Sequence, residues 1–110
     1  MILSRVADAL YWMGRYLERA ENITRLLLVT EEVAREVVGL DESLARAEWS
    51  ELRTIFPGPD GAAAPPLPVR GLAQTTLYDL SIDPRHPYSI FFSLKKARDN
   101  ARTVREALTI

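Results

Sequence analysis

Residues 5–38 constrain the fold most, because they form a long run without proline in which apolar residues recur every three or four positions. This spacing is typical of one face of an α-helix. Ser4 stands where it can cap the first turn, and Gly39 stands where helices commonly end. The run therefore predicts one helix of about 34 residues, roughly 50 Å long at about 1.5 Å per residue.

The apolar face expected for this helix is wide. With successive residues placed 100° apart, one set of side chains falls at its centre and a second set extends it. The central set is Val6, Leu10, Met13, Leu17, Ala20, Thr24 and Leu28, and the flanking set is Ala9, Trp12, Tyr16, Ile23 and Leu27. We expect this face to pack against the other helices of the chain.

The rest of the chain predicts further helices separated by proline-containing breaks. They are expected over residues 42–56, over 69–80 and from 87–89 to about 108, although TTLY in the second also permits a strand. Asp41 is the expected cap of the first, and the Pro/Gly-rich residues 57–68 predict a loop. Residues 1–110 thus predict a single all-α domain, a helical bundle of two long and one or two shorter helices.

Composition excludes several classes of function. The 110 residues are 47% hydrophobic and 26% charged, with a net charge of -1, which is typical of a globular domain and argues against a general binder of nucleic acid or anionic membranes. The chain has no cysteine and one histidine, so thiol chemistry, disulfides and histidine clusters for metals are excluded within one chain. We expect no cofactor, no metal, no nucleic-acid partner and no membrane partner.

The N-terminus does not have the layout of an export signal. Asp8, Arg15 and Glu18 interrupt the apolar residues early, and the longest aliphatic run covers only residues 26–29. The expected compartment is therefore the cytoplasm.

A polar stripe lies opposite the apolar face of the first helix. Its members and close neighbours are Arg15, Glu18, Arg19, Glu21, Asn22 and Arg25. Three interpretations stay open: solvated ion pairs at helical spacing, a buried network that fixes helix register, or a ligand or catalytic site. Because apolar residues bracket the stripe, we expect a neighbouring helix or chain to cover part of it, and Glu18→Ala and Arg19→Ala to destabilise or dissociate the assembly.

The last helix carries a narrow apolar stripe beside an arginine ridge. The stripe is Ile90, Leu94, Ala97, Ala101, Val104 and Leu108, and its small residues would allow another helix to approach closely. The ridge is Arg98, Arg102 and Arg105, with Asp99 and Asn100 beside it. Asp99 can pair with Arg102 at helical spacing.

Three parts of the sequence resemble the bacterial alpha-E family, a helical family named for a Glu-Arg motif. The resemblance rests on MILSRVADALYWMGRYLERAENITRLL at the N-terminus, DPRHPYSI at 83–90 and ARDNARTVRE at 97–106. It implies that Glu18 and Arg19 are the Glu-Arg pair, with Asn22 in the same block, and that residues 98–102 are the second block. Asp99 and His86 depart mildly from the family pattern, which has glutamate and asparagine there.

The resemblance also concerns length and partners. Members of the family usually run on past the second block, so the chain resembles the N-terminal part or a short variant of the fold. Self-association would cover apolar surface left open, so a homo-oligomer is expected. The family is similar to proteins encoded beside, or fused to, ATP-grasp peptide-ligase-like and transglutaminase-like proteins, which implies a role in a system that makes or trims amide bonds.

Three functions can be weighed from these observations. The first is a helical scaffold or partner-recognition domain serving an ATP-grasp ligase. The second is an enzyme or small-anion site that uses Glu18 and neighbouring arginines, although no recognisable nucleophile set, glycine-rich phosphate loop or metal motif accompanies them. The third, nucleic-acid binding by the basic residues of 95–105, is disfavoured by the net acidity. His86, between two prolines, is expected in a surface loop, and Trp12 and Trp49 are expected to be core or interface anchors.

Overall fold

A computed structural model describes residues 2–61 and 63–109, and that part of the chain contains four helices and no strand. The helices are α1 (Ile2–Val38), α2 (Glu42–Ile55), α3 (Val69–Ser81) and α4 (Ile90–Leu108). They form an elongated body whose Cα extents are 60 × 25 × 16 Å. The all-α prediction is confirmed, and TTLY lies within α3 rather than in a strand. In the described part of the chain, we find no helix that is both long enough and apolar enough to traverse a bilayer.

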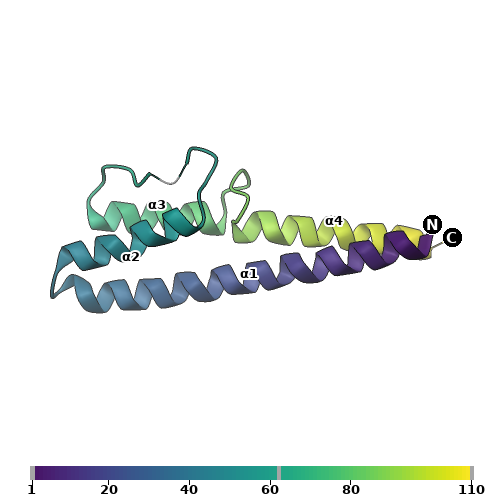
Figure 1. The fold of residues 1–110 in the computed structure, drawn as a ribbon, viewed down its shortest axis with the longest axis horizontal. Coiled ribbons are helices and arrows are strands. Elements are labelled where there is room, and N and C mark those ends of the chain that lie inside the picture. Colours follow the sequence, from purple (N-terminus) through teal and green to yellow (C-terminus); the bar gives the residue numbers. More distant parts are fainter. Residues whose placement is uncertain (1, 62, 110) are drawn as a thin grey trace.

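The long helix α1 is the spine of the fold. The chain turns back at its C-terminal end into α2, and α3 and α4 then follow one another almost in line, antiparallel to α1 (Figure 1). One end of the molecule therefore contains three helices, α1, α2 and α3. The other end, which we call the arm, contains only the N-terminal half of α1 and α4, with the first and last described residues close together (Figure 1).

The starts of α2 and α4 agree with local sequence signals. The Asp41 side chain accepts a hydrogen bond from the Ser43 backbone N–H at 2.9 Å, and Ser89 accepts one from the Phe92 N–H at 3.0 Å. These two caps satisfy backbone donors that lack partners in the first turn. The expected Ser4 cap is wrong, because α1 already begins at Ile2.

The buried side of α1 differs from the face expected from 100° steps. Its buried residues are Ala9, Ala20, Ile23, Leu27, Thr30 and Ala34, whereas Leu10, Leu17, Thr24 and Leu28 are exposed. With the half-buried Met13 and Tyr16, the buried set repeats at alternating intervals of four and three residues. That period of 3.5 is typical of helices wound around one another, and it drifts away from a straight 3.6-residue face.

The same shift occurs in α4. The helix buries Ser93 and Ala97 and half-buries Asn100, Val104 and Ala107. The expected stripe is therefore wrong in part: Leu94, Ala101 and Leu108 are exposed, while Ala97 and Val104 lie at the contact as expected. Small residues occupy the fully buried positions of the seam between the two helices of the arm, and leucines flank it; these small residues are Ala9, Ala20, Ser93 and Ala97.

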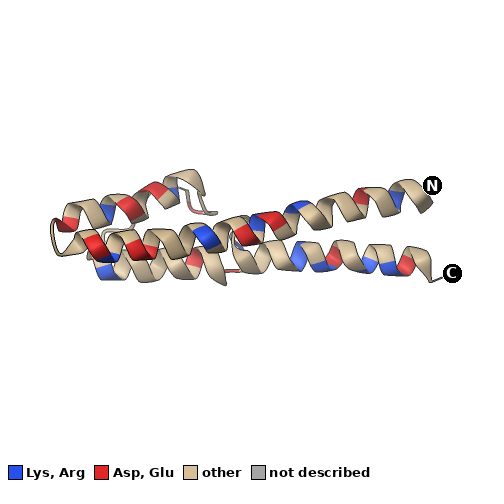
Figure 2. Cartoon of the chain, turned by 90° about the horizontal axis from the view of Figure 1, so that it is seen from below, with Lys and Arg blue, Asp and Glu red and all other residues tan. Residues whose placement is uncertain are grey.

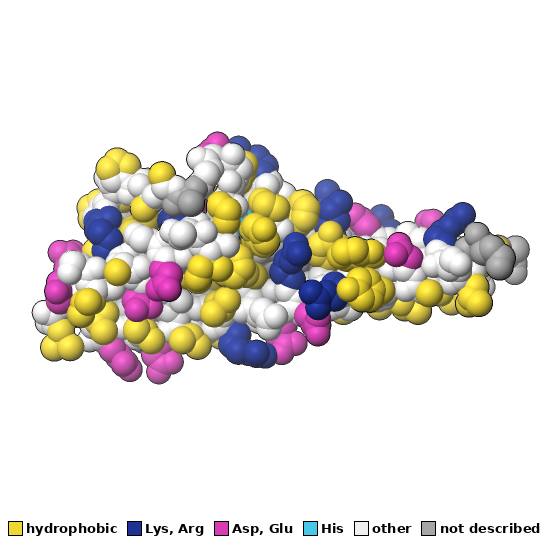
Figure 3. Space-filling view, in the orientation of Figure 1, with side chains coloured by type: hydrophobic (Ala, Val, Ile, Leu, Met, Phe, Trp, Pro, Cys, Tyr) yellow, Lys and Arg dark blue, Asp and Glu magenta, His cyan; other side chains and the backbone are white. Residues whose placement is uncertain are grey.

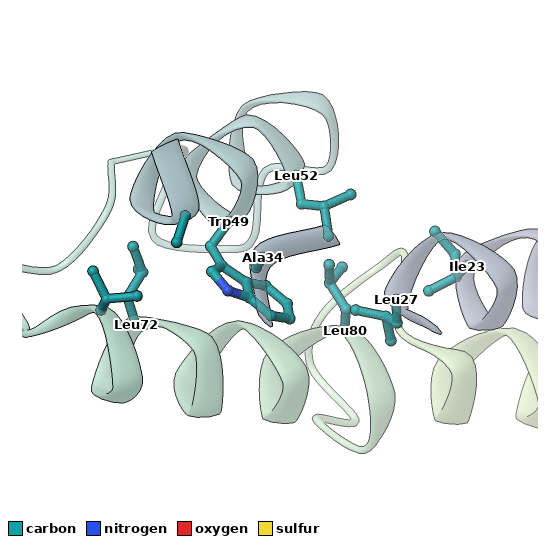
Figure 4. Close-up of a cluster of buried hydrophobic side chains, with 9 residues drawn as sticks. Ile23, Leu27, Ala34, Trp49, Leu52, Leu72 and Leu80 are labelled. Atoms are coloured by element: carbon teal, nitrogen blue, oxygen red, sulfur yellow. The ribbon is translucent and has the colours of Figure 1, made fainter. Parts of the chain in front are cut away.

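The hydrophobic core lies at the three-helix end. It consists of Ile23, Leu27, Ala34, Ala45, Trp49, Leu52, Val69, Leu72 and Leu80. Trp49 projects from α2 toward α3, with Leu72 and Leu80 on either side (Figure 4), and only 2% of it is exposed. The expectation that Trp49 is a core anchor is confirmed. Beside this core, Arg53 of α2 donates to Asp79 of α3 at 2.9 Å.

Candidate functional site: an arginine–tyrosine cleft on the long helix

A cleft of about 700 Å³ opens where the middle of α1 meets the end of α2 and the linker between α3 and α4. We call it the arginine–tyrosine cleft. Its lining residues are Tyr11, Trp12, Arg15, Tyr16, Glu18, Arg19, Asn22, Ile23, Arg25, Leu26, Phe56 and Tyr88. Figure 3 shows basic side chains beside hydrophobic ones near the middle of the molecule, where the thicker end narrows into the arm. Five of the six residues of the polar stripe, all except Glu21, thus lie at one cleft.

Arg19 is the half-buried member of the Glu-Arg pair. Its guanidinium carbon lies 5.3 Å from the centre of the Tyr16 ring and 5.4 Å from the centre of the Tyr88 ring. Such cation–π contacts contribute about 0.5–2 kcal/mol, depending on how far water is excluded. Arg19 therefore joins α1 to the linker before α4.

Glu18 and Asn22 are instead exposed at the surface of the chain. Arg15 donates to Glu18 at 3.2 Å, and Arg25 pairs with Glu21, but all four of these side chains are largely exposed. Exposed pairs of this kind contribute about 0–1 kcal/mol. The expectation that neighbouring helices shield Glu18 and Asn22 from water does not hold within this chain. Figure 2 shows basic and acidic residues interspersed along α1 in the same way.

The linker between α3 and α4 positions Tyr88. The Asp83 carboxylate accepts from the Arg85 backbone N–H at 3.0 Å, and the Ser89 hydroxyl donates to the Asp83 carbonyl at 2.7 Å. Asp83 and Ser89 are both buried. The DPRHPYSI segment is thus a self-bonded turn that ends in the cap of α4 and presents Tyr88 to Arg19. Two of the three matched sequence blocks meet at this contact.

His86 lies inside this turn, so its expected place in a surface loop is wrong. It is 4% exposed, because the loop at Gly58 covers its ring. Its Nδ1 accepts from the Tyr88 backbone N–H at 3.1 Å. Burial lowers the pKa of His86 below its ordinary value of 6.5, against the opposing effect of the carboxylates of Asp79 and Asp83. The ring is therefore a structural acceptor that holds Tyr88 in place.

The second block of the resemblance does not reach the cleft. Arg98, Asp99, Arg102 and Arg105 are exposed on α4, and Asn100 is half-buried and donates to the Lys96 carbonyl at 2.8 Å. Within residues 2–61 and 63–109, the expected pair between Asp99 and Arg102 is not formed. The structure thus separates the two groups of predicted site residues.

Several residues of the cleft were not predicted from the sequence. Tyr16, Tyr88 and Phe56 contribute aromatic walls, and Trp12 is 43% exposed at the cleft rather than in the core. The Tyr88 contact comes from a segment far along the chain, so helical periodicity could not reveal it. The available signal is the tyrosine within DPRHPYSI, one of the three blocks that carry the family resemblance.

A second hollow lies on the other flank of α1, and we call it the leucine groove. It has a volume of about 440 Å³ and is lined by Leu17, Ala20, Glu21, Thr24, Arg25, Leu28, Ile90 and Leu94. The groove is mostly apolar and runs between α1 and α4. Among the residues that the structure describes, no group of three or more acidic or histidine side chains is placed to hold a metal ion.

Comparisons with known proteins identify a family that is described by a Glu-Arg motif. Residues 2–110 match the Alpha-E family model, described as a predicted alpha-helical domain with a conserved ER motif. Glu18-Arg19 is the single Glu-Arg dipeptide in the sequence. Residues 18 and 19 are therefore the one place where this sequence has an adjacent Glu-Arg motif.

Similar proteins occur in mycobacteria. An uncharacterized protein of Mycobacterium bovis is 37% identical over 113 residues, which are 96% of this chain and 13% of the relative. An uncharacterized protein of Mycobacterium tuberculosis is 36% identical over the same shares. The chain thus spans a small part of the length of these relatives, and no solved structure matches it. By the match over nearly its whole length, the chain belongs to the Alpha-E family.

Proposed function

We propose that the chain is a helical recognition domain whose leucine groove binds an amphipathic helix of a partner polypeptide. The observation that carries this proposal is the row of exposed leucines beside the seam of the arm. Leu17 is 46% exposed, and Leu28 and Leu94 are exposed on either side of the same groove. Contiguous apolar surface of this kind on a small domain is typical of an interaction site.

The spacing of the leucines supports a helix as the occupant. Leu3, Leu10 and Leu17 recur at intervals of seven residues, about 10.5 Å along α1. A partner helix with an apolar heptad repeats at the same interval. Adding it beside α1 and α4 would extend the three-helix packing of the core end along the two-helix arm. Glu21 and Arg25, which pair with one another, would stand at the rim of that contact.

The partner that we infer belongs to an amide-bond-forming system with an ATP-grasp peptide-ligase-like enzyme, following the family resemblance. In the mycobacterial relatives most of the polypeptide lies outside the matched segment. A helix that seats in the groove can therefore belong to the same polypeptide as the matched segment or to a separate one. Both arrangements use the same surface.

The enzyme alternative has weaker support from the geometry. Glu18 is the carboxylate that it would use as acid or base, and this side chain is open to water and paired with Arg15. Catalytic acids and bases usually act where water is excluded and their partners are fixed. The arrangement around Glu18 favours binding over proton transfer.

Co-purification with an ATP-grasp peptide-ligase-like protein of the same organism tests the proposal. We expect the partner to co-elute with the wild type and with Leu44→Glu, and to be lost from Leu17→Glu. Leu44, on α2, is 50% exposed and lies outside the groove, so it is a matched control. Circular dichroism melts would establish that both variants fold.

Three results would contradict the proposal. The first is equal retention of the partner by both variants, and the second is its absence from the wild type. The third is a homodimer of the chain alone that Leu17→Glu dissociates while no ligase-like protein binds, because the groove would then belong to a second copy.

A further inference from the structure

We infer that the arginine–tyrosine cleft binds an anionic group carried on a flat apolar body, such as an aryl carboxylate or an aryl phosphate. This site is separate from the leucine groove, with which it shares only Arg25 among its lining residues. The inference therefore stands apart from the proposed partner helix, and either can fail without the other.

The charge of the cleft favours an anion. Its lining contains three arginines, Arg15, Arg19 and Arg25, against one carboxylate, Glu18. Arg15 and Arg25 already have carboxylate partners in Glu18 and Glu21. Across residues 2–61 and 63–109, the Arg19 side chain forms no ion pair and donates no hydrogen bond to another residue. Its N–H groups are thus available to a ligand.

The setting of Arg19 prepares it for this role. Contact with the rings of Tyr16 and Tyr88 restricts a side chain that would otherwise sample many rotamers. A planar guanidinium can bind a carboxylate or phosphate through two parallel N–H donors, and such pairs are among the stronger hydrogen bonds in proteins. Holding the guanidinium in place before binding reduces the entropy lost when the ligand arrives.

The apolar walls of the cleft would select the flat apolar body of the ligand, as the arginines would select its anionic group. Tyr11, Trp12, Phe56 and Leu26 add aromatic and aliphatic surface beside the arginines. A volume near 700 Å³ lies within the range of about 300–1,000 Å³ typical of small-molecule sites. Mostly apolar walls with a few converging polar groups are also the usual composition of such sites. A flat ring joined to an anion would contact both kinds of wall.

The fluorescence of Trp12 can report whether a ligand occupies the cleft. It lines the cleft, whereas Trp49 is buried in the core, so a ligand-induced change in tryptophan fluorescence reports on Trp12. Four probes separate the components of the site: benzoate and phenyl phosphate carry a ring and an anion, acetate carries only the anion, and benzyl alcohol carries only the ring. Titrations of the 110-residue chain would use each probe up to about 10 mM, where a weak fragment with a millimolar Kd saturates.

We expect benzoate, phenyl phosphate or both to bind saturably and at least about tenfold more tightly than acetate or benzyl alcohol. The better of the two identifies the anion as carboxylate or phosphate. Arg19→Gln should weaken binding about tenfold or more, and Arg19→Lys should keep the charge but bind less tightly than the wild type because the two-pronged donor is lost. Arg5→Gln, an exposed arginine of α1 outside the cleft, should bind as the wild type does.

The inference is overturned if no probe saturates, if benzyl alcohol binds as tightly as the anions, or if Arg5→Gln weakens binding as much as Arg19→Gln. Thermal melts of the variants guard against misfolding as the cause. If Arg19→Gln does not fold, the comparison of wild type with Arg19→Lys and the ratio of benzoate to benzyl alcohol affinity decide the question.

Discussion

The guanidinium carbon of Arg19 lies 5.4 Å from the centre of the Tyr88 ring. The contact joins the Glu-Arg pair on α1 to the turn that precedes α4. This contact links two segments that are distant in the sequence. It gives the arginine of the pair a role in both the fold and the cleft, while Glu18 stays exposed at the rim.

A double-mutant cycle on Arg19 and Tyr88 should measure this contact. We expect Arg19→Met and Tyr88→Leu each to lower the free energy of unfolding, and the double variant to reveal a coupling of about 0.5–1 kcal/mol. Tyr88→Phe keeps the ring and should be close to the wild type. Urea unfolding at neutral pH would provide the four values. Strict additivity of the two single changes would show that the rings and the guanidinium do not interact.

Glu18→Ala should change stability little, in contrast to the expectation drawn from the apolar residues that bracket the polar stripe. Its ion pair with Arg15 is exposed, and such pairs contribute about 0–1 kcal/mol. A thermal melt is sufficient, with Glu21→Ala as a comparison at an equally exposed pair. A loss of several kcal/mol from Glu18→Ala alone would mean that the carboxylate is buried in the folded protein.

His86 should make the chain less stable in mild acid. Burial lowers its pKa in the folded state, so the unfolded state binds the proton first, near its ordinary value of 6.5. The free energy of unfolding should therefore fall as pH decreases from about 7 to 5, a window above the ordinary titration of aspartate and glutamate. Urea unfolding across that range would show the slope in the wild type. In His86→Gln the slope should flatten, and an identical slope would assign it to another group.

Arg53→Met should lower the free energy of unfolding by about 2 kcal/mol. The side chains of Arg53 and Asp79 are only 17% and 23% exposed, and removing the arginine leaves the Asp79 carboxylate half-buried without its partner. Arg35→Met removes an exposed pair with Glu31 and should have almost no effect. Equal effects in denaturant unfolding would argue against a special role for the α2–α3 pair.

The sequence allowed the helices to be predicted well because their ends carry local signals. Asp41, Ser89 and the prolines of 57–68 act within a few residues, and the structure follows them. The buried face of α1 is harder to predict from the sequence, since the choice between 3.6 and 3.5 residues per turn depends on the helix that α1 contacts. Leu17 was therefore expected in the core and Ile23 only at its edge, whereas the structure exposes the first and buries the second.

Only some of the residues that line the cleft could be predicted from the sequence. Arg15, Glu18, Arg19, Asn22 and Arg25 stood out by their spacing, and they do line one cleft. Tyr88 and Phe56 reach it from other elements, so no helical pattern connected them with α1. His86 was misjudged for a similar reason: neighbouring prolines indicated a turn, but the loop at Gly58 that covers the ring belongs to a different part of the chain.

The account depends most on the division of α1 into a seam that holds the fold and flanks that remain open. Thermal unfolding of Leu17→Glu and Leu27→Glu tests it directly, because a straight helical face places both leucines in the core. We expect the free energy of unfolding of Leu17→Glu to lie within about 1 kcal/mol of the wild-type value. Leu27→Glu should lose several kcal/mol or fail to fold, since it buries an unpaired charge in the hydrophobic core. Equal destabilisation by the two changes would contradict the account.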